Sequence, residues 1–451
     1  MTDRGNFGSK IGIVLATAGS AVGLGNVWRF PFMVGQNGGA AFIIVYVGCI
    51  LLLGIPGMVS EFIVGRHSQA NAARAYASFS NSKAWGLVGI LGVLTSTIIL
   101  GFYAVVAGWC MQYLGASVLG QLKGDSTFVL HYFQRFSTDP VKPAVLGVAF
   151  ILLTHFVIVR GVKDGIERVS KLLMPLLFIL LLIIVGASCS LPGAGKGVEF
   201  LLKPDFSKLS SQVFLEALGQ AFFSLSLGTA CLCTYASYFS RHTHLLQAAG
   251  QIALVDLLIA VLSGLMIFPA AFSVGVLPDS GPSLIFITLP NVFQQAFAFM
   301  PMLGYVISIM FYALLVFAAL TSTISMHEIG TAFFSEEFGM RRSHAAWILT
   351  IVCGLIAVFC SLSIGQADLQ LFGKSLMDFC DFVTAQVMLP LGALLTSILV
   401  GWCASKVVVR NEFTNHETAS SKSFFGFYMF CVRFIVPVCI LLILMHQFGV
   451  I

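Results

Sequence analysis

The sequence predicts an all-α membrane protein with about eleven transmembrane helices. Of its 451 residues, 58% are hydrophobic and only 10% are charged, whereas a soluble domain has about 25% charged residues. The apolar residues also form long runs separated by short loops, which is typical of a polytopic membrane protein. The net charge of +5 is small and dispersed, so we expect a lipid bilayer and no nucleic acid as partner.

Apolar runs long enough to cross the hydrocarbon core of a bilayer occur eleven times. They are expected at 10–34, 40–64, 87–119, 144–160, 165–189, 212–238, 246–277, 300–334, 345–361, 371–403 and 427–448. None of the loops is long enough for a soluble domain, so residues 1–451 are interpreted as one transmembrane domain.

The distribution of Lys and Arg predicts the orientation. With a cytoplasmic N-terminus, sixteen of these residues lie on the inner side and seven on the outer side, as the positive-inside rule requires. The first apolar run is too long for a signal peptide and has no small-residue cleavage site. The eleven cysteines lie mostly inside spans without metal-ligand spacing, which favours packing over metal or redox chemistry.

The first span contains a predicted break. Its segment 19–31 holds three glycines, an asparagine, an arginine and a proline. Lipid offers no hydrogen bonds, so a break at membrane depth has to line a protected cavity. A second cluster of small and hydroxylated residues, 223–230, interrupts the span 212–238. Paired interruptions of this kind indicate a transport site.

The two interrupted spans are five spans apart, so two copies of a repeat would have opposite topology. We therefore expect a 5+5 inverted repeat, with 10–189 as the first half, 212–403 as the second and 427–448 as an additional helix.

Several polar residues fall inside these spans. Asp256 has no Lys or Arg within a helical turn, so it is a candidate ion ligand or proton carrier, with a structural polar contact as the alternative. Thr321 and Ser322 fit either a sodium site or hydrogen bonds to preceding carbonyls. Arg29 and Asp381 both lie in the outer halves of their spans. They could form a salt bridge that acts as an outer gate, or they could be two unrelated charges that snorkel to the membrane surface.

The longest motifs are AGSAVGLGNVWRFP at 18–31, NGGAAF at 37–42, GQAFFSLSLG at 219–228, TYASY at 234–238 and ALTS at 319–322. In these motifs the chain resembles the neurotransmitter:sodium symporters, and most closely their bacterial, leucine-transporter-like amino-acid transporters. The resemblance covers nearly the whole chain. It implies discontinuous first and sixth helices and two sodium ions as coupling ions.

The resemblance also implies which groups hold sodium. The first site would use the Ala21 carbonyl, the side chains of Asn26 and Ser224, Asp256 where the family often has Asn, and the substrate carboxylate. The second site would use the carbonyls of Gly19, Val22 and Ala318 and the hydroxyls of Thr321 and Ser322.

The substrate class follows from Gly23, where the family's animal monoamine transporters have an Asp. Glycine leaves room for a substrate carboxylate against the amides of Leu24 and Gly25, at the positive end of a half-helix. The resemblance places the substrate among Ala21, Val22, Gly23, Leu24, Gly25, Ile99, Tyr103, Phe223, Ser224, Ser226, Thr229, Ser322 and Met326. Since the pocket has no charged side chain, a neutral, hydrophobic or aromatic amino acid is expected.

The family's other functional features map onto this chain as well. Asp256 brings a negative charge beside Tyr46, Gln220 and Ser224, the set that holds chloride in animal members, so chloride independence is expected. The gates would be Arg29 with Asp381 outside and Arg4 with Glu336 inside. Residues 165–175, from a glycine to a proline, would unwind the start of the fifth span.

Together these features predict sodium-driven amino-acid uptake by alternating access, in a bacterial inner membrane. A transporter-like sensor that binds an amino acid without moving it is the alternative. An enzyme has little support, because the sequence shows neither a nucleophile–base pair nor a metal triad.

Overall fold

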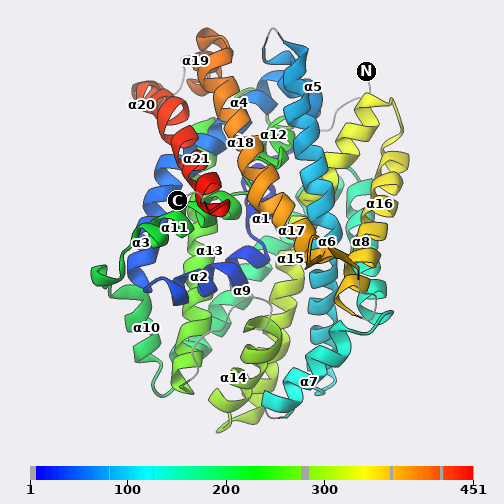
Figure 1. Cartoon of the computed structure of the whole chain (residues 1–451), viewed down its shortest axis with the longest axis vertical. Helices are drawn as coiled ribbons and strands as arrows, with labels where there is room; N and C mark the ends of the chain where they lie inside the picture. Colours follow the sequence, from blue (N-terminus) through cyan, green and yellow to red (C-terminus); the bar gives the residue numbers. More distant parts are fainter. Residues whose placement is uncertain are drawn as a thin grey trace.

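The computed structural model describes residues 7–80, 82–124, 126–275, 284–365, 369–416 and 420–449. Almost all of these residues are helical, and the helices pack side by side along the long axis of the molecule (Figure 1). Within the described ranges the strands are limited to one hairpin, β1 (Gln370–Leu371) and β2 (Lys374–Ser375). The prediction of an all-α fold is therefore confirmed.

The helices of the first half are α1 (Lys10–Ala21), α2 (Phe30–Gln36), α3 (Ala40–Cys49), α4 (Ile55–Ser68), α5 (Ala72–Ser78), α6 (Gly86–Val118), α7 (Ser126–Ser137), α8 (Lys142–Val159), α9 (Arg168–Cys189) and α10 (Gly195–Leu202). Those of the second half are α11 (Ser211–Ser224), α12 (Cys231–Ala236), α13 (Leu245–Ser273), α14 (Leu289–Ala296), α15 (Pro301–Glu337), α16 (Arg342–Ile364), α17 (Leu376–Asp381), α18 (Leu389–Ile398), α19 (Lys406–Phe413), α20 (Phe425–Phe430) and α21 (Val436–Gln447). Short π-helical turns join several of them, such as Gly25–Arg29 before α2.

The number of spans differs from the prediction of eleven. Among the described residues, nine helices are long and apolar enough to cross a membrane, and the bent pair Lys10–Ala21 and Gly25–Gln36 makes ten. The remaining predicted span, 212–238, is divided into α11 and α12 by six non-helical residues. Each piece is too short to cross a bilayer alone, since about 20 helical residues are needed.

The core of the bundle surrounds α1. This helix packs against α9, α13 and α15, and its chain reaches the middle of the molecule before it turns into α2 (Figure 1). Large side chains such as Phe30, Tyr46 and Phe268 are fully buried there. Many apolar residues on the outer surface are exposed instead, for example Leu87 and Leu172, as expected of helices that face lipid.

The expected unwinding of residues 165–175 is not present. Val162–Glu167 forms a π-helical turn that continues directly into α9, and Pro175 lies inside that helix. Gly165 has a packing role, because a Cβ there would lie 2.1 Å from the carbonyl oxygen of Val157. Proline inside a transmembrane helix is tolerated when neighbouring groups satisfy the backbone, so the Gly–Pro spacing alone did not predict the local structure.

Candidate functional site

The first break lies between α1 and the turn Gly25–Arg29, where the axis bends by 56°. Val22 leaves the helical region with φ −73° and ψ 105°. The amide of Gly23 donates to Oδ1 of Asn26 at 3.1 Å, and the amide of Leu24 donates to the hydroxyl of Tyr103 at 3.2 Å. The break therefore frees backbone groups that a continuous helix would pair internally, and side chains satisfy two of them.

Space at this break is limited by neighbouring side chains. A Cβ on Gly23 would lie 2.5 Å from Oγ of Ser322 and 3.2 Å from the hydroxyl oxygen of Tyr103. A Cβ on Gly25 would lie 3.2 Å from the ring of Phe223. Side chains at these two positions would occupy the space in front of the freed amides, so the glycines keep it accessible to a ligand.

The second break, residues 225–230, is maintained by backbone conformation and by a buried acid. Ser226, Gly228 and Ala230 have positive φ angles of 53°, 82° and 59°. Glu61 on α4 accepts hydrogen bonds from the amide of Gly228 at 2.7 Å and from the amide of Cys233 at 3.4 Å. One carboxylate thus accepts hydrogen bonds from two amides at the interrupted segment.

Thr229 completes the second break. Its hydroxyl donates to the carbonyl of Ser226 at 2.8 Å and accepts from the amide of Cys231 at 3.1 Å. Ser96 on α6 donates to the carbonyl of Thr229 at 2.9 Å. The hydroxyl expected in the substrate pocket is therefore engaged with the backbone of its own loop.

A fully buried carboxylate, Asp256 on α13, lies between the two breaks. Asn26 donates to it at 2.7 Å, Ser224 lies 3.0 and 2.9 Å from its two oxygens, and Tyr46 donates at 3.4 Å. These partners are uncharged. Both polar atoms of nearby Gln220 are buried and have no hydrogen-bond partner in the described chain. A buried carboxylate needs compensation, and an oxygen-rich cluster of this kind suits a hard cation.

A second cluster of oxygens joins α1 to α15. Thr321 lies 3.0 Å from the carbonyl oxygen of Ala318 and 3.5 Å from that of Val22, and Ser322 lies 3.2 Å from the carbonyl oxygen of Val22. Gly19 faces the same place, since a Cβ there would lie 3.3 Å from Cβ of Thr321. This site has no carboxylate, but its carbonyl and hydroxyl oxygens at a helix break suit a small cation.

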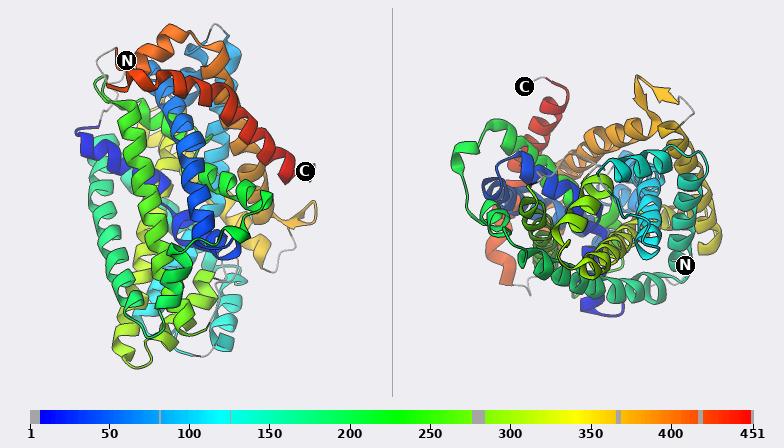
Figure 2. Two further views of the ribbon diagram at one scale, coloured as in Figure 1. Left: turned by 90° about the vertical axis from the view of Figure 1, so that its left-hand side faces the viewer. Right: turned by 90° about the horizontal axis from the view of Figure 1, so that it is seen from below.

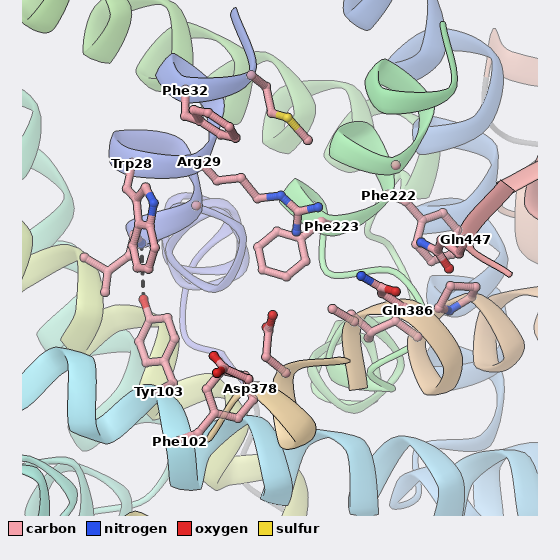
Figure 3. Close-up of a pocket in the computed structure, with 18 of the residues that line it drawn as sticks. Trp28, Arg29, Phe32, Phe102, Tyr103, Phe222, Phe223, Asp378, Gln386 and Gln447 are labelled. Carbon is pink, nitrogen blue, oxygen red and sulfur yellow. Dashed lines mark hydrogen bonds between the residues drawn. The ribbon is translucent and has the colours of Figure 1, made fainter. Parts of the chain in front are cut away.

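A cavity of about 430 Å³ opens above the first break. Leu24, Gly25, Tyr103 and Phe223 line its floor, and the guanidinium of Arg29 lies 4.3 Å from the ring centre of Phe223 (Figure 3). Aromatic side chains make up much of the wall, as Figure 3 shows for Trp28, Phe32, Phe102 and Phe222.

The other expected substrate residues do not line this cavity. Ile99 and Met326 lie one helical turn from Tyr103 and Ser322 respectively, four residues away on the same faces of α6 and α15. Ala21, Val22, Gly23 and Ser224 adjoin the oxygen clusters described above.

The expected outer gate is open in this structure. Arg29 and Asp381 both line the cavity, but no ion pair within 4.0 Å joins them in the described part of the chain. Of the expected inner pair, Arg4 lies outside the described residues. Glu336 accepts a hydrogen bond from the amide of Asn71 at 2.8 Å.

The end of the bundle near the N-terminus is closed. The ring of Phe7 packs against Tyr235, Tyr238 and Phe239 with centroid distances of 5.9, 6.1 and 6.4 Å. Glu167 accepts hydrogen bonds from the amide of Gly8 at 2.6 Å and from the hydroxyl of Ser9 at 2.9 Å, which ties the start of α1 to the turn before α9.

The sequence interpretation missed several residues at this site. Glu61 is an ionisable residue within a span, but its role at the second break depends on its contacts with the amides of Gly228 and Cys233. Gln386 and Gln447 line the cavity opposite Arg29 (Figure 3). A polar amide within an apolar span was the signal that could have pointed to them.

Comparisons with known proteins agree with this geometry. The sodium:neurotransmitter symporter family model matches residues 4–132 and 141–450. The sodium-dependent transporter YhdH of Bacillus subtilis is 40% identical over 98% of both chains, and one from Haemophilus influenzae is 34% identical over 98% of this chain and 97% of the other. The crystal structure of MhsT in complex with L-phenylalanine has a TM-score of 0.89 and 38% identity, and covers 98% of this chain and 100% of that one.

Proposed function

The chain belongs to the sodium:neurotransmitter symporter family, and on that premise we propose that it couples sodium entry to uptake of a neutral amino acid. Membership makes it a sodium-dependent transporter of the membrane and not an enzyme. The proposal adds the substrate class, the sodium sites, the mechanism and the orientation.

The observation that carries the proposal is the position of the Asp256 cluster next to the first break. Asn26 contacts Asp256 at 2.7 Å and also holds the amide of Gly23. A substrate carboxylate at the amide of Leu24 and the hydroxyl of Tyr103 would therefore lie beside a sodium ion held by Asn26, Ser224, Asp256 and the carbonyl of Ala21. Shared contact between the two ligands would make each favour binding of the other.

A second sodium ion is proposed at the oxygens of Gly19, Val22, Ala318, Thr321 and Ser322. This site joins α1 to α15, so sodium there would stabilise the arrangement in which the first break is formed. Sodium loss would weaken that contact and let α1 move.

Alternating access is the proposed mechanism. The cavity is open on the side of Arg29 and Asp381, and Phe7 and Glu167 close the opposite end. Pairing of Arg29 with Asp381 over a bound substrate would close the open side, and release of the contacts at Phe7 would open the other. We assign the N-terminus to the cytoplasm of a bacterial cell, with 10–189 and 212–403 as inverted halves and 427–448 as an added helix.

The substrate side chain is proposed to be hydrophobic or aromatic. Phe102, Phe222 and Phe223 line the entry cavity, and similar MhsT was solved with L-phenylalanine. The negative charge of Asp256 is proposed to replace chloride beside sodium, which makes transport independent of chloride.

Uptake of radiolabelled amino acids into proteoliposomes tests the proposal. We expect uptake of phenylalanine or leucine only with an inward sodium gradient, competition by other neutral apolar amino acids, and no change when gluconate replaces chloride. Asp256→Ala should abolish this uptake, whereas Asp256→Asn should retain part of it and gain chloride stimulation. Binding of the amino acid without accumulation would support the sensor alternative, and sodium affinity unchanged in Asp256→Ala would contradict the first sodium site.

A further inference from the structure

The β1–β2 hairpin has an exposed aromatic tip that the transport site does not use. Its register pairs Gln370 with Ser375 and Leu371 with Lys374, which leaves Phe372 and Gly373 as a two-residue turn. Both have positive φ angles, 53° and 76°, as in a type I′ turn. Asn, Asp or Gly normally occupies the first of these positions because a side chain is strained there.

Phe372 is 91% exposed. A large aromatic side chain in a strained and exposed position gains nothing from burial within the protein. Leu369 and Leu371 are also exposed, at 39% and 43%, so the hairpin presents an apolar patch made of Leu369, Leu371 and Phe372. Exposed patches of this kind mark a surface that is covered by something else.

The position of the hairpin indicates what covers it. It connects two spans, since α16 ends at Ile364 and the next span begins at Leu376, so it lies within a few residues of the edge of the hydrocarbon core. In both views of Figure 2 it projects sideways from the bundle, away from the helices rather than along the long axis. At this level the space beside a transmembrane bundle is the lipid–water interface.

The composition of the hairpin fits that environment. Aromatic residues are enriched where a bilayer meets water, and Lys side chains there reach the lipid phosphates. Lys374 is exposed, and its ammonium lies 5.1 Å from the ring centre of Phe382. The apolar side chain of Phe372 would contact the lipid acyl chains, and the ammonium group of Lys374 would contact the lipid phosphates.

We propose that the β1–β2 hairpin inserts Phe372 into the lipid–water interface of the bilayer, at the level of α17 and on the side of the bundle that leads to α7 and α14 (Figure 1). The partner is the phospholipid surface itself. This assignment depends on the membrane location of the chain and not on the identity of the transported substrate.

Insertion would also connect the bilayer to the mouth of the cavity. Phe372 stacks on Phe379 of α17 with a centroid distance of 5.7 Å. The amide of Leu376 donates to the carbonyl of Leu369 at 3.1 Å, and the side chain of Ser375 caps α17. The hairpin is thus a rigid extension of α17, which carries Asp378 and Asp381 at the cavity.

Tryptophan fluorescence in proteoliposomes tests the insertion. Phe372→Trp is compared with Phe128→Trp, the same substitution at a 44% exposed residue of α7, which lies beyond the hairpin at the end of the bundle opposite the N-terminus (Figure 1). The spectrum of the unsubstituted protein, which contains the five native tryptophans, is subtracted from the spectrum of each variant. Lipids brominated on the upper acyl chain should quench the added emission of Phe372→Trp by roughly half or more, and aqueous iodide should quench mainly Phe128→Trp.

Two results would overturn the proposal. Quenching of Phe372→Trp by iodide, with no effect of brominated lipid, would place the tip in water. Protection from both quenchers would show that protein covers it, as in contact with a second copy of the chain. Leu371→Trp provides the same readout if Phe372→Trp fails to fold.

Discussion

The breaks at 22–24 and 225–230 both interrupt helices inside the bundle, but their polar groups have different partners. At the first break, the amides of Gly23 and Leu24 bond to Asn26 and Tyr103, which belong to the proposed ligand sites. At the second break, Glu61 and a local threonine hydroxyl bond to the backbone.

This difference indicates that the first break serves ligand binding and that the second break serves the stability of the fold. The first break lies between Ala21 and Gly25 and has no positive φ angle, so its groups can exchange their present partners for a ligand with little rearrangement. The second break contains three left-handed residues and depends on fixed partners. Changes at the second break should therefore reduce stability, and changes at the first should reduce ligand affinity.

The largest expected effect is that of Gly228→Ala at the second break. A Cβ there would lie 2.2 Å from the carbonyl oxygen of Leu389, at φ 82°, so we expect a loss of about 3 kcal/mol. A large fall in the thermal midpoint of the detergent-solubilised protein measures it. Gly250→Ala, on α13 where no described atom lies within 4 Å of the added Cβ, should leave the midpoint unchanged or raise it slightly, and similar midpoints for both variants would contradict the prediction.

Glu61→Leu should have the next largest effect, because it removes the carboxylate that accepts a 2.7 Å hydrogen bond from the buried amide of Gly228. We expect a loss of about 2 kcal/mol, measured as the same shift in thermal midpoint. Glu61→Gln keeps one acceptor oxygen and should lose less. Equal stability of the leucine variant and the unsubstituted protein would show that the second break does not need the carboxylate.

Tyr103→Phe at the first break should act on affinity instead. It removes the acceptor for the Leu24 amide and a proposed contact to the substrate carboxylate, so we expect about tenfold weaker amino-acid binding. The thermal midpoint without substrate should hardly change. Scintillation proximity binding measures the affinity, and Tyr113→Phe is the matched control because its buried hydroxyl has no hydrogen-bond partner among the described residues. A large fall in the thermal midpoint of Tyr103→Phe would contradict the prediction, because it would show that the first break also contributes to stability.

The smallest expected effect is that of Thr229→Val, which keeps the shape of the side chain but removes its hydroxyl. The amide of Cys231 then lacks its acceptor, at a cost of about 1 kcal/mol. We expect a small fall in thermal midpoint with unchanged amino-acid affinity. A clear fall in affinity at constant stability would instead assign Thr229 to the substrate pocket.

The success of the sequence interpretation varied with the range of the interactions involved. The broken first helix was predicted correctly because glycine, proline and polar residues within an apolar run act locally. Nine described helices, or ten with the bent pair, are long and apolar enough to cross a membrane, and the sixth predicted span is divided at 225–230, inside the interruption expected at 223–230. The unwinding expected at 165–175 is absent from this structure, in which Val162–Glu167 forms a π-helical turn that continues into α9.

The sequence by itself determined the helical membrane fold, the place of the first break and the family to which the chain belongs, because hydropathy and motif residues are properties of contiguous segments. Only the tertiary structure decided that Glu61 supports the second break, that Asp256 meets Asn26 and Ser224, and that Arg29 and Asp381 stand apart across an open cavity. The contacts among these residues join positions from 32 to 230 apart in the chain. Their geometry depends on how the helices pack around the two breaks, which no local pattern of residues encodes.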